Sequence, residues 1–181
     1  ISGILCGLIR SPEKRGLNIE PQGFVQYGSA WFNYLNDFGN SNERSAFHFS
    51  DIFFYGSELS QPWRKYDFQV SDEAIKASEK YIDSKCRHIV IQPLTSDPKK
   101  NWALENWVQS IRMMSQLLSD VKFVVLGADF EREELKFFKS LERTSVAIEP
   151  LDVSYAILEK SDLLVTGDTA IKHLAAGAGV R

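Results

Sequence analysis

From residue 88 onward, the sequence alternates short apolar runs with segments of helical periodicity. The apolar runs are His88–Gln92, Lys122–Gly127, Ser145–Pro150 and Asp162–Gly167. Helical patterns cover Ala103–Leu118, Glu131–Leu141 and Ser154–Lys160, and the last run leads into a fourth. Strands that alternate with helices in this way are typical of βαβ units, whose right-handed crossovers put helices on both faces of a parallel sheet. The sequence therefore predicts an α/β fold with a Rossmann-like parallel sheet.

Candidate ligand-binding residues, most of them polar, follow three of these predicted strands. They are Thr95, Ser96, Lys99, Lys100 and Trp102 after the first strand, Gly127, Asp129 and Glu131 after the second, and Gly167, Asp168, Thr169 and His173 after the fourth. Open α/β sheets bind ligands at the carboxyl ends of their strands, and a strand order 3-2-1-4 would bring the first and fourth loops together. Lysines, hydroxyls and a helix N-terminus can bind phosphate, and an acid can bind ribose hydroxyls. This set of residues suits a nucleoside diphosphate.

Each of these residues also has a structural explanation. Asp168 and Thr169 are common helix-capping residues. His173 lies on the same helical face as Thr169 but could serve in packing. Lys100 could be a surface charge, and an acid such as Asp129 is favourable at any helix start. No single residue decides between the two interpretations.

The first 87 residues have a different pattern, with many aromatic side chains between Phe24 and Tyr66. Helical spacing is present within 31–38 and 49–53, and the opening nine residues resemble a core strand. We interpret residues 1–70 as the helical, aromatic-rich end of a first domain with a linker, and 71–181 as the Rossmann-like domain. A helical extension packed on that domain is the alternative.

Composition and missing motifs exclude several classes of protein. With 21 basic and 24 acidic residues, the net charge of −3 offers no bulk attraction to nucleic acid or anionic lipid. No apolar run approaches the roughly 20 residues that span a bilayer. The sequence lacks the G-x-G-x-x-G, P-loop and G-x-S-x-G motifs, and its three histidines have no metal-ligand spacing. No Asp-x-Asp pair is present. We therefore expect no cofactor, no metal and no nucleic-acid partner.

The order and spacing of three motifs resemble family 9 glycosyltransferases, the ADP-heptose:lipopolysaccharide heptosyltransferases. These motifs are T-S-x-x-x-K-x-W from residue 95, V-V-L-G from 124, and G-D-T-x-x-x-H-L-A-A-G-A-G-V from 167. The resemblance is strong over 88–181 and weaker before it, where FHFSD at 47–51 is similar to a helix of the family's first domain. It implies the GT-B architecture, in which two Rossmann-like domains face each other and the C-terminal one holds the nucleotide sugar.

The resemblance also assigns roles to individual residues. The donor-binding residues it implies are Thr95, Ser96, Lys100, Asp129, Asp168, Thr169 and His173. The implied reaction is inverting, metal-independent transfer of a sugar, heptose by the resemblance, from ADP-heptose to a lipopolysaccharide-core or related glycan acceptor. The implied setting is the cytoplasm, with at most peripheral contact with the inner membrane. The family's catalytic base would precede Ile1 and the donor domain would continue past Arg181, so we expect this chain alone to be inactive.

Two residues depart from the family's usual pattern. Ala170 stands where glycine is usual, and Lys172 where a small or apolar residue is usual. Because a Cβ at position 170 narrows access to the backbone N–H groups, a degenerate, non-catalytic nucleotide-sugar-binding or scaffold module is the alternative function. A third reading, an epimerase-like enzyme, lacks the Tyr-x-x-x-Lys and G-x-G-x-x-G features.

Overall fold

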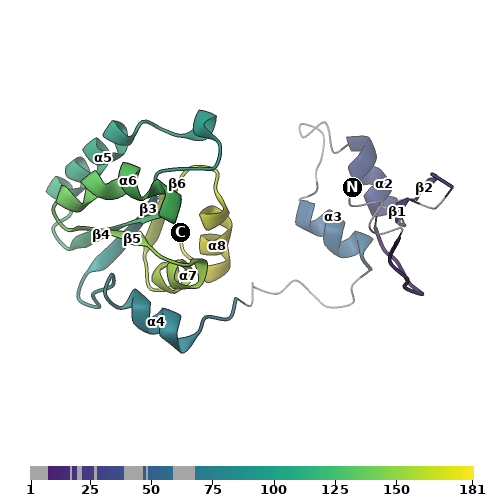
Figure 1. The fold of residues 1–181 in the computed structure, drawn as a ribbon, viewed down its shortest axis with the longest axis horizontal. Helices are drawn as coiled ribbons and strands as arrows, with labels where there is room; N and C mark the ends of the chain where they lie inside the picture. Colours follow the sequence, from purple (N-terminus) through teal and green to yellow (C-terminus); the bar gives the residue numbers. More distant parts are fainter. Residues whose placement is uncertain are drawn as a thin grey trace. The chain divides into compact units, whose positions relative to one another are not determined.

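The computed structural model describes residues 8–16, 18–19, 22–26, 28–38, 47, 49–58 and 68–181. The chain divides into two compact units, Ile1–Trp63 and Arg64–Arg181 (Figure 1). Each unit has its own buried side chains.

The first unit contains a short hairpin and two helices. Strands β1 (Asn18–Ile19) and β2 (Val25–Gln26) pair antiparallel, and helices α2 (Ala30–Phe38) and α3 (Phe49–Gly56) pack together. Phe32 and Ile52 are buried between these elements. The helical spacing of the aromatic residues is confirmed, whereas the hairpin was not predicted. The strand predicted at the start of the chain lies mostly outside the described residues, as does His48 of the FHFSD motif.

The second unit is built on a four-stranded parallel sheet. Its strands are β3 (Arg87–Gln92), β4 (Val121–Gly127), β5 (Thr144–Ile148) and β6 (Leu163–Thr166). They are ordered β5-β4-β3-β6, which is the order 3-2-1-4 that would bring the first and fourth loops together. Each strand lies within two residues of its predicted position. The carboxyl ends of β3 and β6 are therefore neighbours.

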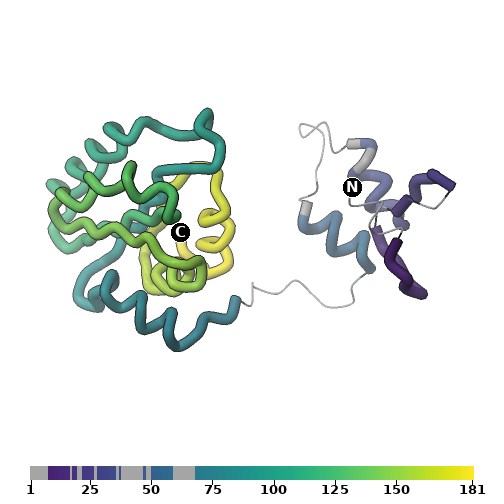
Figure 2. The backbone as a smooth tube through the Cα atoms, in the orientation of Figure 1, coloured from purple at the N-terminus to yellow at the C-terminus, as the bar shows by residue number. Residues whose placement is uncertain are grey.

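Helices cover both faces of this sheet, as the continuous tube also shows (Figure 2). They are α4 (Asp72–Ser78), α5 (Leu104–Leu117), α6 (Arg132–Leu135), α7 (Leu151–Glu159) and α8 (Ala170–Ala178). Helix α4 was not predicted; the Ser71 hydroxyl caps it by accepting a hydrogen bond from the Ala74 N–H at 3.2 Å.

The helix predicted over 131–141 is broken. Helix α6 is a single turn between 3₁₀ segments over Asp129–Glu131 and Lys136–Ser140. A 3₁₀ helix has three residues per turn, so side chains three apart eclipse one another. The buried apolar residues of this segment, Leu135, Phe138 and Leu141, have that spacing. The 3₁₀ geometry therefore directs all three toward the sheet.

Alternate residues of the central strands contribute to different cores. Ile89 and Ile91 of β3 pack with α5, α6 and the 3₁₀ turn after α6, whereas Val90 between them packs with α4, α7 and α8. Strand side chains alternate between faces, so a strand buried on both sides is apolar throughout. This double burial explains why the strands were visible as unbroken apolar runs. Within the described ranges, no helix combines the length and the apolar character that crossing a membrane requires.

Candidate functional site

A cavity of about 360 Å³ lies at the carboxyl-terminal edge of the sheet. Its walls come from the ends of β3 and β4, the loop after β5 and the first residues of α7 and α8. Three of the predicted site residues line it, namely Thr95, Ser96 and Thr169. The cavity therefore lies where the topology of a parallel α/β sheet puts a ligand.

The loops after β3 and β6 meet at one end of this cavity. The Thr95 N–H donates a hydrogen bond to Asn101 Oδ1 at 2.8 Å, and the Thr95 hydroxyl donates to the Asp97 carbonyl at 2.8 Å. A Cβ added to Gly167 would lie 3.3 Å from Thr95 Cγ2 and 3.8 Å from the Lys100 carbonyl oxygen. Because the two loops approach so closely, a side chain from either one can act on the same ligand.

Two lysines flank the Asp168 carboxylate beside this junction. Lys100 Nζ lies 3.0 Å from Asp168 Oδ2, and Lys172 Nζ forms an ion pair with Asp168 Oδ1. These hydrogen bonds, first that of Lys172 and then that of Lys100, lower the pKa of Asp168 to about 2. The same carboxylate raises the pKa of Lys100. We call Lys100, Asp168 and Lys172 the Lys–Asp–Lys cluster.

The two acids after β4 lie in different surroundings. Glu131 is only 7% exposed, lines the cavity, and its Oε2 accepts a hydrogen bond from the Ala128 N–H at 2.7 Å. The side chain of Asp129 is 87% exposed, pairs with Arg132 at 2.6 Å and does not line the cavity. Of the two acids after β4, Glu131 is therefore the one that lines the cavity, and the role of Asp129 at the ribose stays a prediction. The reason is that the first turn after β4 folds the Glu131 side chain back onto the Ala128 N–H.

A second acid, Glu149, lines the cavity at the end of β5. Its Oε1 accepts hydrogen bonds from Lys80 Nζ at 2.7 Å and from the Tyr81 hydroxyl at 2.6 Å. The Lys80 and Tyr81 contacts lower the pKa of Glu149. Glu149 is not among the predicted site residues, although it follows its strand directly, as the predicted residues follow theirs.

His173 does not line the cavity. It lies exposed on α8, one turn after Thr169, and the hydrogen bonds of this helix start involve Thr169 and Lys172 instead. Its assignment to the donor stays a prediction. Ala170, the first of the two departures, does line the cavity.

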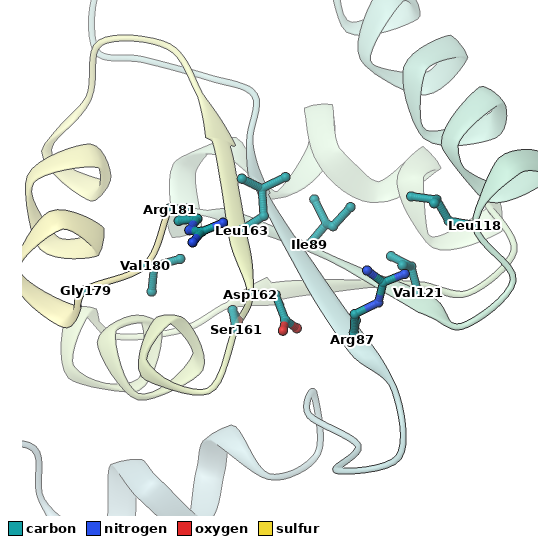
Figure 3. A pocket seen from close by; sticks show the side chains of 10 residues that line it. All are labelled: Arg87, Ile89, Leu118, Val121, Ser161, Asp162, Leu163, Gly179, Val180 and Arg181. Atoms are coloured by element: carbon teal, nitrogen blue, oxygen red, sulfur yellow. The ribbon is translucent and has the colours of Figure 1, made fainter.

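A larger cavity, about 570 Å³, lies at the opposite, amino-terminal edge of the sheet (Figure 3). None of the seven predicted site residues lines it. Two of its polar side chains form structural contacts. Arg87 pairs with Asp120 at 2.9 Å, and Asp162 accepts a hydrogen bond from the His88 N–H at 2.7 Å. We therefore assign the candidate site to the cavity at the carboxyl edge.

In the part of the chain that the structure describes, no group of three or more His, Cys, Asp or Glu side chains is arranged to hold a metal ion. The charged side chains at the candidate site include Lys100 and Lys172 and the carboxylates of Asp168, Glu131 and Glu149. Lysine ammonium groups and hydroxyls are suited to phosphate oxygens, and carboxylates to hydroxyl or amino groups.

The fold and this cavity define a Rossmann-like α/β domain with a polar ligand site at the carboxyl edge of its sheet. Residues 29–181 match the family model of glycosyltransferase family 9 (heptosyltransferase), and the chain belongs to this family. No curated protein matches the chain at a significant level.

Solved structures with a similar fold belong to GT-B glycosyltransferases. The ADP-heptose lipopolysaccharide heptosyltransferase II of E. coli has a TM-score of 0.56 at 18% identity, over 69% of this chain and 40% of that one. A family 9 glycosyl transferase from Veillonella parvula DSM 2008 has a TM-score of 0.64 at 17% identity, over 76% of this chain and 42% of that one. E. coli heptosyltransferase WaaC with ADP has a TM-score of 0.55 at 18% identity, over 75% of this chain and 44% of that one. The chain thus spans about two fifths of the length of these structures, and at such low identity the likeness concerns the fold.

Proposed function

We propose that this chain binds the nucleoside diphosphate of ADP-heptose, and that the whole protein transfers heptose from it to a lipopolysaccharide-core or related glycan acceptor. The observation that carries the proposal is the Lys–Asp–Lys cluster at the β3–β6 junction, with an acid-lined cavity extending from it along the sheet edge. Family membership and the ADP bound in a similar structure support the choice of donor.

The order of polar groups along the sheet edge matches the order of groups in a nucleotide. Lys100 and Thr169 belong to the loops after β3 and β6, Glu131 follows β4 and Glu149 follows β5. We assign the diphosphate to the first pair and the ribose hydroxyls to Glu131. The base then reaches the loop after β5, where Leu151 adds an apolar side chain to the cavity wall.

In the proposed reaction, the acceptor hydroxyl oxygen forms a bond to the anomeric carbon of heptose from the face opposite the diphosphate. The bond from that carbon to the diphosphate oxygen breaks, a base removes the hydroxyl proton, and ADP leaves. Inversion follows from this single displacement. Lys100 and the N-terminus of α8 would stabilise the negative charge that develops on the leaving diphosphate, without a metal. All the residues assigned here act on the donor, and the base before Ile1 stays a prediction.

Calorimetric titration of ADP against the parent and Lys100→Ala tests the donor site. We expect the substitution to weaken ADP binding roughly 10- to 100-fold, because it removes a charge-assisted hydrogen bond to the phosphates and one of the two cations that neutralise Asp168. Lys99→Ala is the matched control, since the neighbouring Lys99 is also exposed but its ammonium is not among those paired with Asp168. Equal ADP affinity in the parent and Lys100→Ala would contradict the assignment.

The second candidate function is a non-catalytic nucleotide-sugar-binding module. It is favoured by Ala170, whose position at the cavity puts a methyl group where the family usually has glycine. A transfer assay on the whole protein, with ADP-heptose and a lipopolysaccharide-core acceptor, separates the two functions. Saturable formation of the glycosylated acceptor, detected by mass spectrometry, would exclude the binding module.

A further inference from the structure

Lys172 is the second departure from the family's usual pattern, and the structure gives it a defined contact. It lies in the first turn of α8, four residues after Asp168, and its ammonium pairs with the Oδ1 oxygen of that carboxylate. The other oxygen, Oδ2, is held by Lys100 at 3.0 Å. Both oxygens of one aspartate are therefore occupied by different lysines, from the loop after β3 and from α8.

The balance of charge around Lys100 depends on this contact. Besides Asp168, the Asp97 carboxylate is close enough to raise the pKa of Lys100. Without Lys172, one ammonium would face two carboxylates, and the junction of the β3 and β6 loops would carry a net negative charge. With Lys172, two cations balance the two anions. Because a diphosphate is itself strongly anionic, this difference decides whether the junction repels or accepts it.

We propose that Lys172 is a specificity-determining residue of the donor site, which makes the β3–β6 junction selective for the diphosphate group of a nucleotide. It neutralises Asp168, leaves the Lys100 ammonium available to phosphate oxygens, and brings a second ammonium to the same place. The side chains of Lys100, Asp168 and Lys172 are about half exposed, so all three are accessible to a ligand that binds at the β3–β6 junction. This inference rests on the proposed function, and it adds a residue that the family's usual pattern does not supply.

Calorimetric titrations with ADP and with adenosine test the inference on the 181-residue chain. We expect Lys172→Gln to weaken ADP binding about three- to tenfold, because the group is partly exposed and its charge is partly screened. Adenosine binding should stay unchanged, because adenosine lacks the phosphates. Lys172→Arg keeps the charge and should keep ADP affinity within about twofold of the parent.

Lys136→Gln is the matched control. Lys136 is also exposed and forms an ion pair with a carboxylate near it in the sequence, Glu133, but it does not line the cavity. The variant should bind ADP like the parent. If Lys172→Gln binds ADP as tightly as the parent, or loses ADP and adenosine affinity equally, the inference is wrong while the proposed function stands. If the folded parent binds no ADP, the proposed function is wrong and the inference with it.

Discussion

At the residue scale, Glu131 and Asp129 are two positions apart and have separate roles in the structure. We expect Glu131→Gln to weaken ADP binding by about tenfold, because a carboxylate is the stronger acceptor for ribose hydroxyls. The glutamine carbonyl oxygen can still accept the Ala128 N–H, so the turn after β4 should persist. Calorimetry with ADP measures the loss, and inorganic pyrophosphate should bind both proteins equally.

Asp129→Asn is the matched control, because Asp129 is exposed and pairs with Arg132 outside the cavity. It should leave ADP affinity unchanged. The opposite outcome, with Asp129→Asn weakening binding and Glu131→Gln neutral, would support Asp129 as the ribose acid. Sequence alone could not separate the two, because both acids follow the same strand. The direction of each side chain is set by the turn that Glu131 closes.

His88 gives the fold a dependence on pH. It is 1% exposed in β3, and its Nε2 accepts a hydrogen bond from the Asp83 N–H at 3.1 Å. Burial lowers the pKa of His88 below its usual value, against the opposing effect of Asp162. The unfolded chain therefore binds the proton more readily than the folded one. Its contribution to stability is complete above the unfolded pKa of about 6.5 and is lost as pH falls toward the folded pKa.

Urea denaturation at about pH 7.5 and about pH 5.5 measures this effect. The parent should lose stability at the lower pH, and His88→Gln should lose less because its side chain takes up no proton in this range. His173→Gln, which replaces an exposed histidine, should lose as much stability at the lower pH as the parent does. NMR titration of the His88 ring gives an independent check if His88→Gln does not fold. A ring that titrates at or above the unfolded pKa would refute the argument.

At the element scale, Gly127 ends β4 where the strand meets α6. A Cβ at this position would lie 2.1 Å from Leu135 Cδ1, 3.1 Å from Ile148 Cδ1 and 3.2 Å from Glu131 Oε2. Leu135 is fully buried, so little room exists for it to move. We expect Gly127→Ala to lower the free energy of unfolding by about 1–3 kcal/mol through overpacking. Gly167→Ala, whose nearest contact would be 3.3 Å away, should cost less in the same denaturation experiment.

Elements that the local pattern determines were predictable, and elements that depend on distant contacts were not. The four strands were readable because each contains a short, mainly apolar run, longest in the central strands β3 and β4. Helix α4 is only seven residues long, and Ala74 is its one buried apolar residue, so its periodicity is faint. The broken helix after β4 was misread because 3.0 and 3.6 residues per turn differ little over two turns. Its geometry is set by the sheet beneath it.

The candidate site follows the same division. The loop positions of Thr95, Lys100, Asp168 and Thr169 could be predicted, because parallel strands share one carboxyl edge. The strand order that makes the loops of β3 and β6 neighbours came from the structure. Pairing of Lys172 with Asp168 could have been read from their spacing of four residues across the start of α8. The contact of Lys100 with the same carboxylate could not have been predicted, because the two residues are 68 positions apart in the sequence.

At the scale of the whole molecule, the described core of the sheet and the candidate site both belong to the second unit. Both core clusters and all seven predicted donor residues belong to Arg64–Arg181. The first unit instead buries Phe32 and Ile52 between its own helices and exposes Phe24, Phe53 and Tyr55. Nucleotide binding and folding of the second unit should therefore be independent of the first.

A shortened chain of residues 64–181 should thus fold cooperatively and bind ADP with an affinity within about twofold of the parent, or 0.4 kcal/mol. Its sheet keeps all four strands, and the Lys–Asp–Lys cluster, Glu131 and Glu149 keep every partner named for them. Circular dichroism on heating establishes folding, and calorimetry gives the affinity. Lys100→Ala in the shortened chain should cost the same factor as in the parent. A shortened chain that melts cooperatively but binds ADP more than about tenfold more weakly would mean that the first unit contributes to the donor site.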